Sequence, residues 1–131
     1  MEAAVLQILI VSSLMVLSQQ TAVQHVRFMC QQTSLASPAE VLKLRNGDLT
    51  NADPKIQKYA YCVYKNLGLT SPDGINKQMG LKMLSPKTDP AKFMSSVDKC
   101  NNYHKDGTVE ERFWKVLNCF DNKYPGDIYV L

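Results

Sequence analysis

Apolar residues recur along most of this chain with the period of an α-helix. In the clearest stretch, which begins at Pro54, apolar side chains stand three, four, seven and eleven residues after Ile56 and would share one helix face. Asp53 offers an N-cap oxygen before Pro54, and Gly68 suits the left-handed position that follows a helix. Cys62 stands mid-helix, so we expect this element to be stapled to a neighbour, with the other helices packed around it.

The same period predicts five further short helices and no strand of useful length. Capping boxes begin two of them, at Ser37 and Thr108, and Asp89 followed by Pro90 begins another. The expected fold class is therefore all-α, a compact bundle of about six short helices. The five lie at residues 22–32, 38–44, 75–84, 90–101 and 109–124.

The helix that follows Thr108 has the most informative pattern. At 100° per residue, one face carries Val109, Phe113, Val116, Leu117, Phe120 and Tyr124. Cys119 lies on one edge of this face and Glu110 on the opposite edge. Trp114 falls just outside the face, beside Glu110. After this helix the chain ends in four apolar residues, Ile128 to Leu131, which we expect to fold back as a lid; simple fraying is the alternative.

The beginning of the chain differs from the rest. Ala3 to Leu17 is apolar apart from three polar residues, and it is too short and wrongly flanked for a membrane span. We interpret residues 1–18 as a cleaved secretory signal peptide, with cleavage after Ala22 as the alternative. One domain, residues 19–131, remains, and we expect it to be secreted and extracellular without stable membrane insertion.

Charge argues against a nucleic-acid partner. The chain has fifteen Lys and Arg against twelve Asp and Glu, so losing Glu2 with the signal peptide leaves a net charge of +4. These charges are interspersed, and neither a basic run nor an RNA-binding aromatic motif accompanies them. We therefore expect no nucleic acid to bind.

Four cysteines in a secreted chain predict two disulfides. Four cysteines permit three pairings, and the sequence alone does not choose among them. Cys100 and His104 stand four residues apart and would suit a zinc site, but an oxidising compartment and the lack of a Cys-x-x-Cys pair disfavour it. We expect no metal and no cofactor.

Catalysis finds little support. His104 and Asp106 form the one close His/Asp pair, and no serine in a nucleophile-elbow context accompanies them. We expect the protein not to be an enzyme.

The cysteine spacing, Cys30-x31-Cys62-x37-Cys100-x18-Cys119, together with six short helices and a signal peptide, resembles the insect odorant-binding protein family. The segments Cys-Val-Tyr-Lys-Asn-Leu-Gly-Leu and Asp-Gly-Ile-Asn resemble its region between the third and fourth helices. The usual pattern has six cysteines, and here Lys58 and Glu110 occupy the two missing positions, as in the four-cysteine Minus-C type. The resemblance implies the pairs Cys30–Cys62 and Cys100–Cys119.

The resemblance further implies a carrier with an internal apolar cavity. Such a protein reversibly binds small hydrophobic odorants or pheromones and transports them through aqueous fluid toward membrane olfactory receptors, as a monomer or weak homodimer. A secreted helical interaction protein and a general carrier in non-sensory tissue are the alternatives. Methionines suit an adaptable cavity wall. The candidate pocket-lining residues are Val26, Met29, Ile75, Met79, Met83, Met94, Val97, Phe113, Val116, Leu117, Phe120 and Tyr129.

The missing bridge carries one further expectation. In this alignment Lys58 and Glu110 face one another, and their opposite charges would form a salt bridge; an accidental, solvated pairing is the alternative. An exposed pair contributes about 0–1 kcal/mol, so it would not replace a disulfide. We expect the sixth helix to loosen on its Glu110 edge and to admit ligands there.

Overall fold

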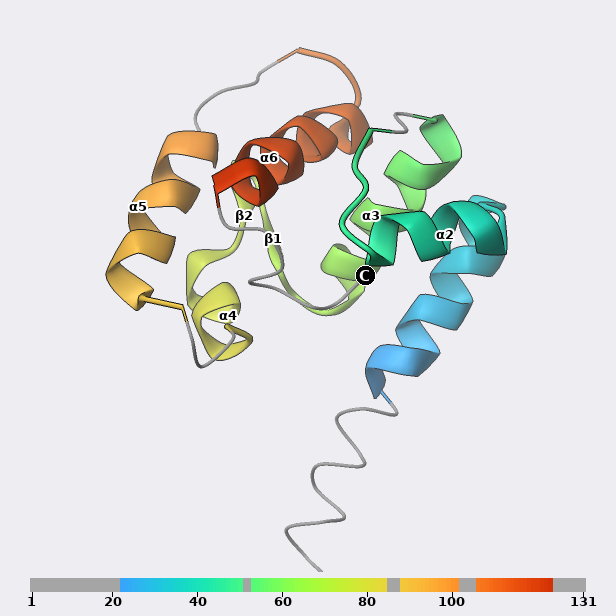
Figure 1. The fold of residues 1–131 in the computed structure, drawn as a ribbon, viewed down its shortest axis with the longest axis horizontal. Coiled ribbons are helices and arrows are strands. Elements are labelled where there is room, and N and C mark those ends of the chain that lie inside the picture. The colour runs from blue at the N-terminus through green and yellow to red at the C-terminus, as the bar shows by residue number, and fades with distance from the viewer. Residues whose placement is uncertain (1–21, 51–52, 85–87, 102–105, 124–131) are drawn as a thin grey trace, which may run out of the picture.

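The structure is a computed structural model that describes residues 22–50, 53–84, 88–101 and 106–123, with the side chains of the last helix described as far as Phe120. Residues 22–34 are helical and are followed by five further helices (Figure 1). The all-α fold class is confirmed. The helices are α2 (Pro38–Arg45), α3 (Pro54–Asn66), α4 (Lys77–Lys82), α5 (Pro90–Asn101) and α6 (Val109–Lys123), and the strands β1 (Thr70–Ser71) and β2 (Gly74–Ile75) lie between α3 and α4.

Local signals set both ends of α3. The Asp53 carboxylate accepts a hydrogen bond from the backbone N–H of Lys55 at 2.8 Å. At the other end Gly68 adopts a positive φ of 74°, and the N–H of Leu69 reaches back to the carbonyl of Tyr64 at 2.8 Å. This arrangement is a Schellman motif, and it satisfies carbonyls that the helix end leaves without partners.

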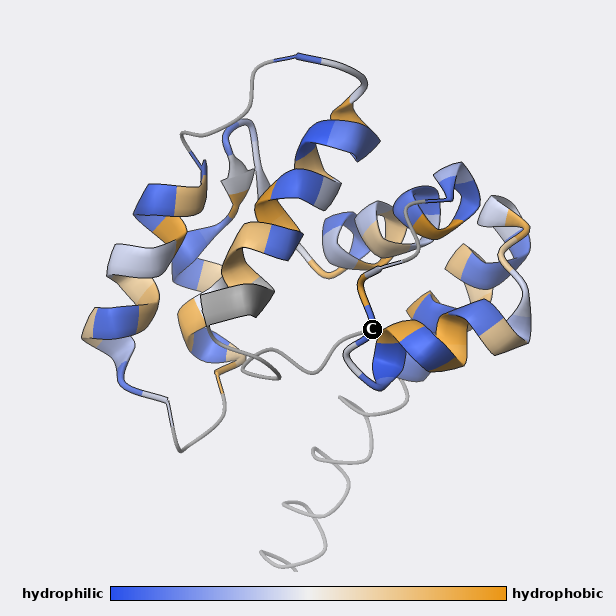
Figure 2. Ribbon diagram, turned by 45° about the horizontal axis from the view of Figure 1, so that its top comes forward, coloured by the Kyte–Doolittle hydropathy of each residue, from blue (hydrophilic) through white to orange (hydrophobic). Residues whose placement is uncertain are grey.

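The helix α6 occupies the middle of the molecule. It packs against α3 on one side and α5 on the other, and it also contacts β2 (Figure 1). Apolar positions of the helices turn inward (Figure 2). Phe113 meets Tyr64 of α3 with ring centroids 5.0 Å apart, and Phe120 meets Phe93 of α5 edge-on at 5.4 Å. Such aromatic pairs join the central helix to both neighbours.

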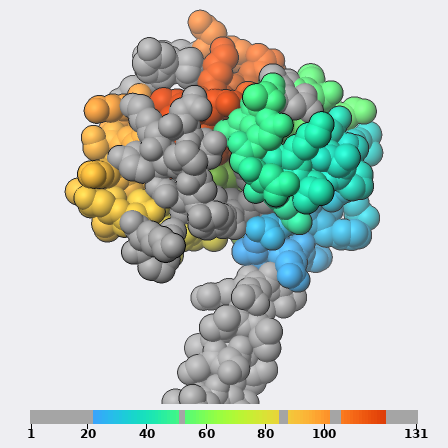
Figure 3. Space-filling view, in the orientation of Figure 1, coloured from blue at the N-terminus to red at the C-terminus, as the bar shows by residue number. Residues whose placement is uncertain are grey.

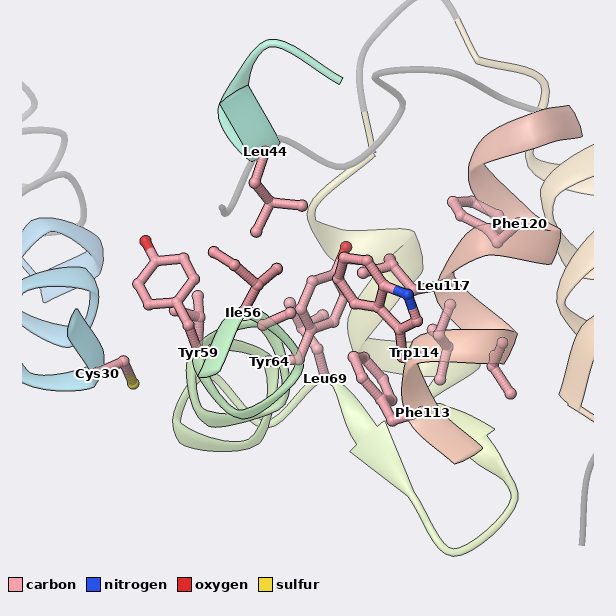
Figure 4. Close-up of a cluster of buried hydrophobic side chains, with 14 of the residues drawn as sticks. Cys30, Leu44, Ile56, Tyr59, Tyr64, Leu69, Phe113, Trp114, Leu117 and Phe120 are labelled. Atoms are coloured by element: carbon pink, nitrogen blue, oxygen red, sulfur yellow. The ribbon is translucent and has the colours of Figure 1, made fainter. Parts of the chain in front are cut away.

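Two residues of α6 depart from the predicted face. Trp114, expected just outside it, is only 5 % exposed and lies among the side chains that fill the space between α3 and α6 (Figure 4). A central helix is covered on more than one side, so its buried surface is wider than a single stripe. Val109 was placed on the face but is 41 % exposed, because it is the first residue of the helix.

Two disulfides join neighbouring elements. Cys30 of the first helical segment is bonded to Cys62 of α3, and Cys100 of α5 is bonded to Cys119 of α6, with Cα–Cα distances of 5.6 Å and 5.7 Å. All four cysteines lie in the described ranges, and none is free. These are the pairs that the resemblance implied.

The predicted fourth helix starts too early. Ile75, expected at its beginning, lies in β2, which pairs antiparallel with β1 so that Thr70 stands opposite Ile75. The helix itself begins after Asn76, whose side chain caps the N–H of Met79 at 3.2 Å, and it ends at the C-cap Met83. Asn101 explains the difference: its side chain accepts from the N–H of Ile75 at 3.0 Å and donates to its carbonyl at 2.9 Å. A distant side chain thus holds Ile75 in an extended conformation.

Several expectations fall on residues outside the described ranges. They are the signal peptide over residues 1–18, His104, Tyr124, Tyr129 and the tail from Ile128 to Leu131. Within the described ranges, none of the helices has the length and apolar character needed to cross a membrane.

Figure 3 shows one face of the molecule, with α5 on one flank and α2 on the other.

Candidate functional site

A pocket lies between the β1–β2 hairpin and the first turns of α6. Its volume is about 120 Å³. The hairpin forms one side, α6 the other, and one residue each from α3 and α5 completes the wall. Phe113 and Val116, two of the residues predicted to line a cavity, are part of it. The lining residues are Tyr61, Ser71, Pro72, Asp73, Gly74, Asn101, Val109, Arg112, Phe113 and Val116.

Gly74 allows the hairpin to lie close to the helices. Its φ is 141°, in the region that favours glycine. A Cβ at this position would lie 2.5 Å from Oδ1 of Asn101 and 3.0 Å from Cγ1 of Val116. Any other residue would therefore push the hairpin away from both α5 and α6 and change the wall of the pocket.

The pocket is amphipathic. Val109, Phe113 and Val116 of α6 provide an apolar wall, and the Tyr61 ring packs edge-on against Phe113 at 5.6 Å. Arg112 stands on the same turn of the helix, and its Nε is buried without a hydrogen-bond partner among the described residues. The sequence did not point to Arg112, because an arginine beside an apolar stripe normally faces solvent.

A second hollow, of about 270 Å³, lies along the outer side of α3. We call it the α3 groove; it is lined by Thr33, Ser34, Lys58, Tyr61, Cys62, Lys65, Asn66 and Glu110. Tyr61 therefore borders both hollows. The ring of Tyr61 also carries Lys65 Nζ above it, 5.9 Å from the centroid.

Lys58 and Glu110, the positions at which the resemblance places the two missing cysteines, meet at this groove. Lys58 is exposed and Glu110 is half-buried, and both belong to the lining. They form no ion pair, so the salt bridge expected from the sequence is absent. Within the described ranges an ion pair joins Lys77 to Asp98 at 2.6 Å instead. The edge of α6 that lacks a covalent tie therefore opens onto a groove.

The other predicted pocket residues belong to one hydrophobic cluster (Figure 4). Ile75, Val97, Leu117 and Phe120 are buried within it, together with Phe113 and Val116. Five more are half-buried and pack against its surface: Val26, Met29, Met79, Met83 and Met94. Ser96 adds a polar atom that sequence reasoning missed, since its buried hydroxyl has no hydrogen-bond partner in the described part of the chain.

Tyr59 and Arg27, whose pKa values are shifted by burial, line neither the pocket nor the α3 groove. Burial raises the pKa of Tyr59 in α3, and the positive charges of Arg45 and Arg27 oppose part of that rise. Burial also lowers the pKa of Arg27, and Arg45 adds to the effect. Among the described residues, no cluster of three His, Cys, Asp or Glu could hold a metal ion.

Comparison with known proteins now defines the class. The sequence profile of the PBP/GOBP family matches residues 13–123, and the chain belongs to this family. Its fold is similar to that of the fatty acid binding protein OBP56a from the oral disk of the blowfly Phormia regina, with a TM-score of 0.65 and 25 % identity over 80 % of this chain and 90 % of that one. A comparison with curated proteins gives no match. The resemblance to insect odorant-binding proteins is confirmed, and the family is one of binding proteins rather than enzymes.

Proposed function

We propose that this protein is a secreted carrier that reversibly binds small hydrophobic odorants or pheromones and transports them through aqueous fluid toward olfactory receptors. It would be a four-cysteine, Minus-C member of its family. The observation that carries the proposal is the match of the family profile to residues 13–123. The half-buried methionines around the aromatic core support it, because flexible thioethers can adapt to ligands of several shapes.

Affinity would come mainly from burial of apolar ligand surface, worth roughly 25 cal/mol per Å². A few polar groups at the pocket wall would orient the guest. The blowfly protein with a similar fold is described as a fatty acid binding protein from the oral disk. Acyl chains therefore join odorants as candidate ligands, and a general carrier outside sensory tissue remains the second candidate function.

A displacement assay with a fluorescent apolar probe tests the proposal. The secreted protein should bind the probe, and a panel of apolar volatiles and acyl compounds should displace it. Met79→Ala and Phe113→Leu should each alter the rank order of the panel, with individual affinities changing by about 1–3 kcal/mol. Leu42→Ala is the matched control, because Leu42 is exposed and belongs neither to the pocket lining nor to the hydrophobic cluster against which Met79 packs.

Two outcomes would count against it. A folded protein that binds no probe would contradict the carrier function. A folded Met79 or Phe113 variant with an unchanged rank order would contradict the pocket assignment of that residue and leave it a packing role.

A further inference from the structure

Among the described residues, the Nε–H of Arg112 has no hydrogen-bond partner, although a buried donor normally has one. This nitrogen is shielded from solvent. Asp73 lines the same pocket and carries the opposite charge, but the two side chains form no ion pair. A buried donor without a partner is destabilising, so a small movement of this side chain that brings the donor to a ligand acceptor would be favoured here.

The remaining polar groups of the pocket are largely committed elsewhere. The Asn101 amide is occupied by both backbone groups of Ile75, at 3.0 Å and 2.9 Å. The Ser71 hydroxyl donates to the carbonyl of Ile75 at 3.4 Å. Arg112 is therefore the strongest donor left to a guest, and the apolar wall of Val109, Phe113 and Val116 lies directly beside it.

We propose that Arg112 recognises the carboxylate of an organic acid whose hydrocarbon part lies along this apolar wall. A planar guanidinium matches a carboxylate with two parallel N–H···O bonds. A pocket of about 120 Å³ holds the head group and the first carbons. A longer chain would continue over Val109, which is 41 % exposed. This inference rests on the proposed carrier function and names a ligand class for one pocket.

Asp73 sets the strength of this recognition. Its exposed carboxylate shares the pocket and repels an anionic guest, so it lowers the affinity for an acid without affecting a neutral ligand. The two residues together therefore predict opposite effects of two substitutions, and a residue with only a structural role would not produce that pattern.

The experiment compares octanoic acid with octan-1-ol at pH 7, where the acid is ionised. Titration calorimetry on the secreted protein should show tighter binding of the acid. Arg112→Gln should weaken acid binding about tenfold and leave the alcohol unchanged, and Arg112→Lys should recover only part of the loss. Asp73→Asn should strengthen acid binding severalfold at low salt. Lys115→Gln removes an exposed cation from the same helix and should change neither ligand.

An NMR measurement on the unmodified protein tests the inference even if an Arg112 variant fails to fold. In the unmodified protein, octanoate should shift the NMR resonance of the Arg112 Nε–H, and the alcohol should not. Equal loss of both ligands in Arg112→Gln, or an unmoved Nε–H resonance in the presence of bound acid, would overturn the inference. Failure of both ligands to bind, together with a failed apolar-probe assay, would instead overturn the carrier function.

Discussion

In the loop after α2, the Asp48 side chain forms two hydrogen bonds with Thr50. Its carboxylate accepts hydrogen bonds from the Thr50 hydroxyl at 2.5 Å and from the Thr50 N–H at 3.0 Å. Both bonds favour the ionised form, so the pKa of Asp48 lies below its ordinary value of 3.8. The bonds thus stabilise the folded state above the unfolded pKa, and this contribution is lost as the pH falls through the lower folded pKa.

Replacing Thr50 by valine should raise the pKa of Asp48 toward 3.8, because the hydroxyl donor is lost while the backbone bond remains. NMR titration of the carboxyl groups measures the change. Thr50→Ser is the matched control, because serine keeps the hydroxyl donor, and it should leave the pKa of Asp48 below its ordinary value. An unchanged Asp48 curve would show that the hydroxyl bond is not formed in solution.

Residues whose partners are close in sequence were the predictable ones. Asp53 and Gly68 act within four residues of their own positions, so cap chemistry alone placed both ends of α3. Arg112 could not be assigned in this way. Its surroundings come from the hairpin, which is some forty residues earlier in the chain, and no local pattern records that proximity.

At the scale of elements, α4 and α5 meet through a glycine. A Cβ on Gly80 would lie 2.6 Å from Cζ of Phe93. The Phe93 ring is fully buried and held edge-on against Phe120, so it has little room to move away. Glycine disfavours a helix interior, but Gly80 is the residue that allows α4 to dock against α5.

Gly80→Ala should lower the free energy of unfolding. Overpacking costs about 1–3 kcal/mol, and the better helix propensity of alanine returns about 1 kcal/mol, which leaves a net loss of up to about 2 kcal/mol. Urea denaturation measures it. In a chain that already carries Phe93→Leu, the same change should be neutral or stabilising. A stabilised Gly80→Ala protein with Phe93 intact would show that α4 and α5 pack more loosely than the structure indicates.

The local sequence pattern was not sufficient to place β1, β2 and the start of α4. Strands of two residues are too short to show alternation, so β1 and β2 carry no readable pattern. Ile75 is apolar whether it lies in a strand or at a helix start, and the hydrogen bonds of Asn101 decide between them. Trp114 was misjudged because the pattern assumed one packing partner for α6, whereas the fold surrounds that helix.

At the scale of the molecule, the covalent ties hold α6 on one side only. Cys119 joins it to α5, whereas Glu110 and Lys58 face the α3 groove without an ion pair. Among the described residues, the packing of α3 against α6 provides the attachment at that edge. The two existing disulfides close loops of 33 and 20 residues. In the chain-entropy model each of them stabilises the folded state by about 3–4 kcal/mol.

A disulfide introduced by Lys58→Cys with Glu110→Cys should raise the melting temperature and slow ligand exchange. It would close a loop of 53 residues, worth about 4 kcal/mol in the same model. The matched control is Lys58→Ser with Glu110→Ser, which removes both charges and forms no bond. Thermal denaturation and probe release rates are the measurements. If the bond cannot form without disturbing the fold, the two residues are not neighbours and the alignment of the missing cysteines fails.

The positions of the two disulfides also decide what a single broken peptide bond would do. The covalent rings, residues 30–62 and 100–119, follow one another along the chain and do not interlock. A cut inside either ring leaves one covalent molecule. A cut anywhere in residues 63–99, the stretch that carries the hairpin and α4, leaves two pieces held together by non-covalent contacts alone. A disulfide between positions 58 and 110 would join the two halves across that stretch. Without it, the backbone of residues 63–99 is the one covalent link between the half that contains Cys30–Cys62 and the half that contains Cys100–Cys119.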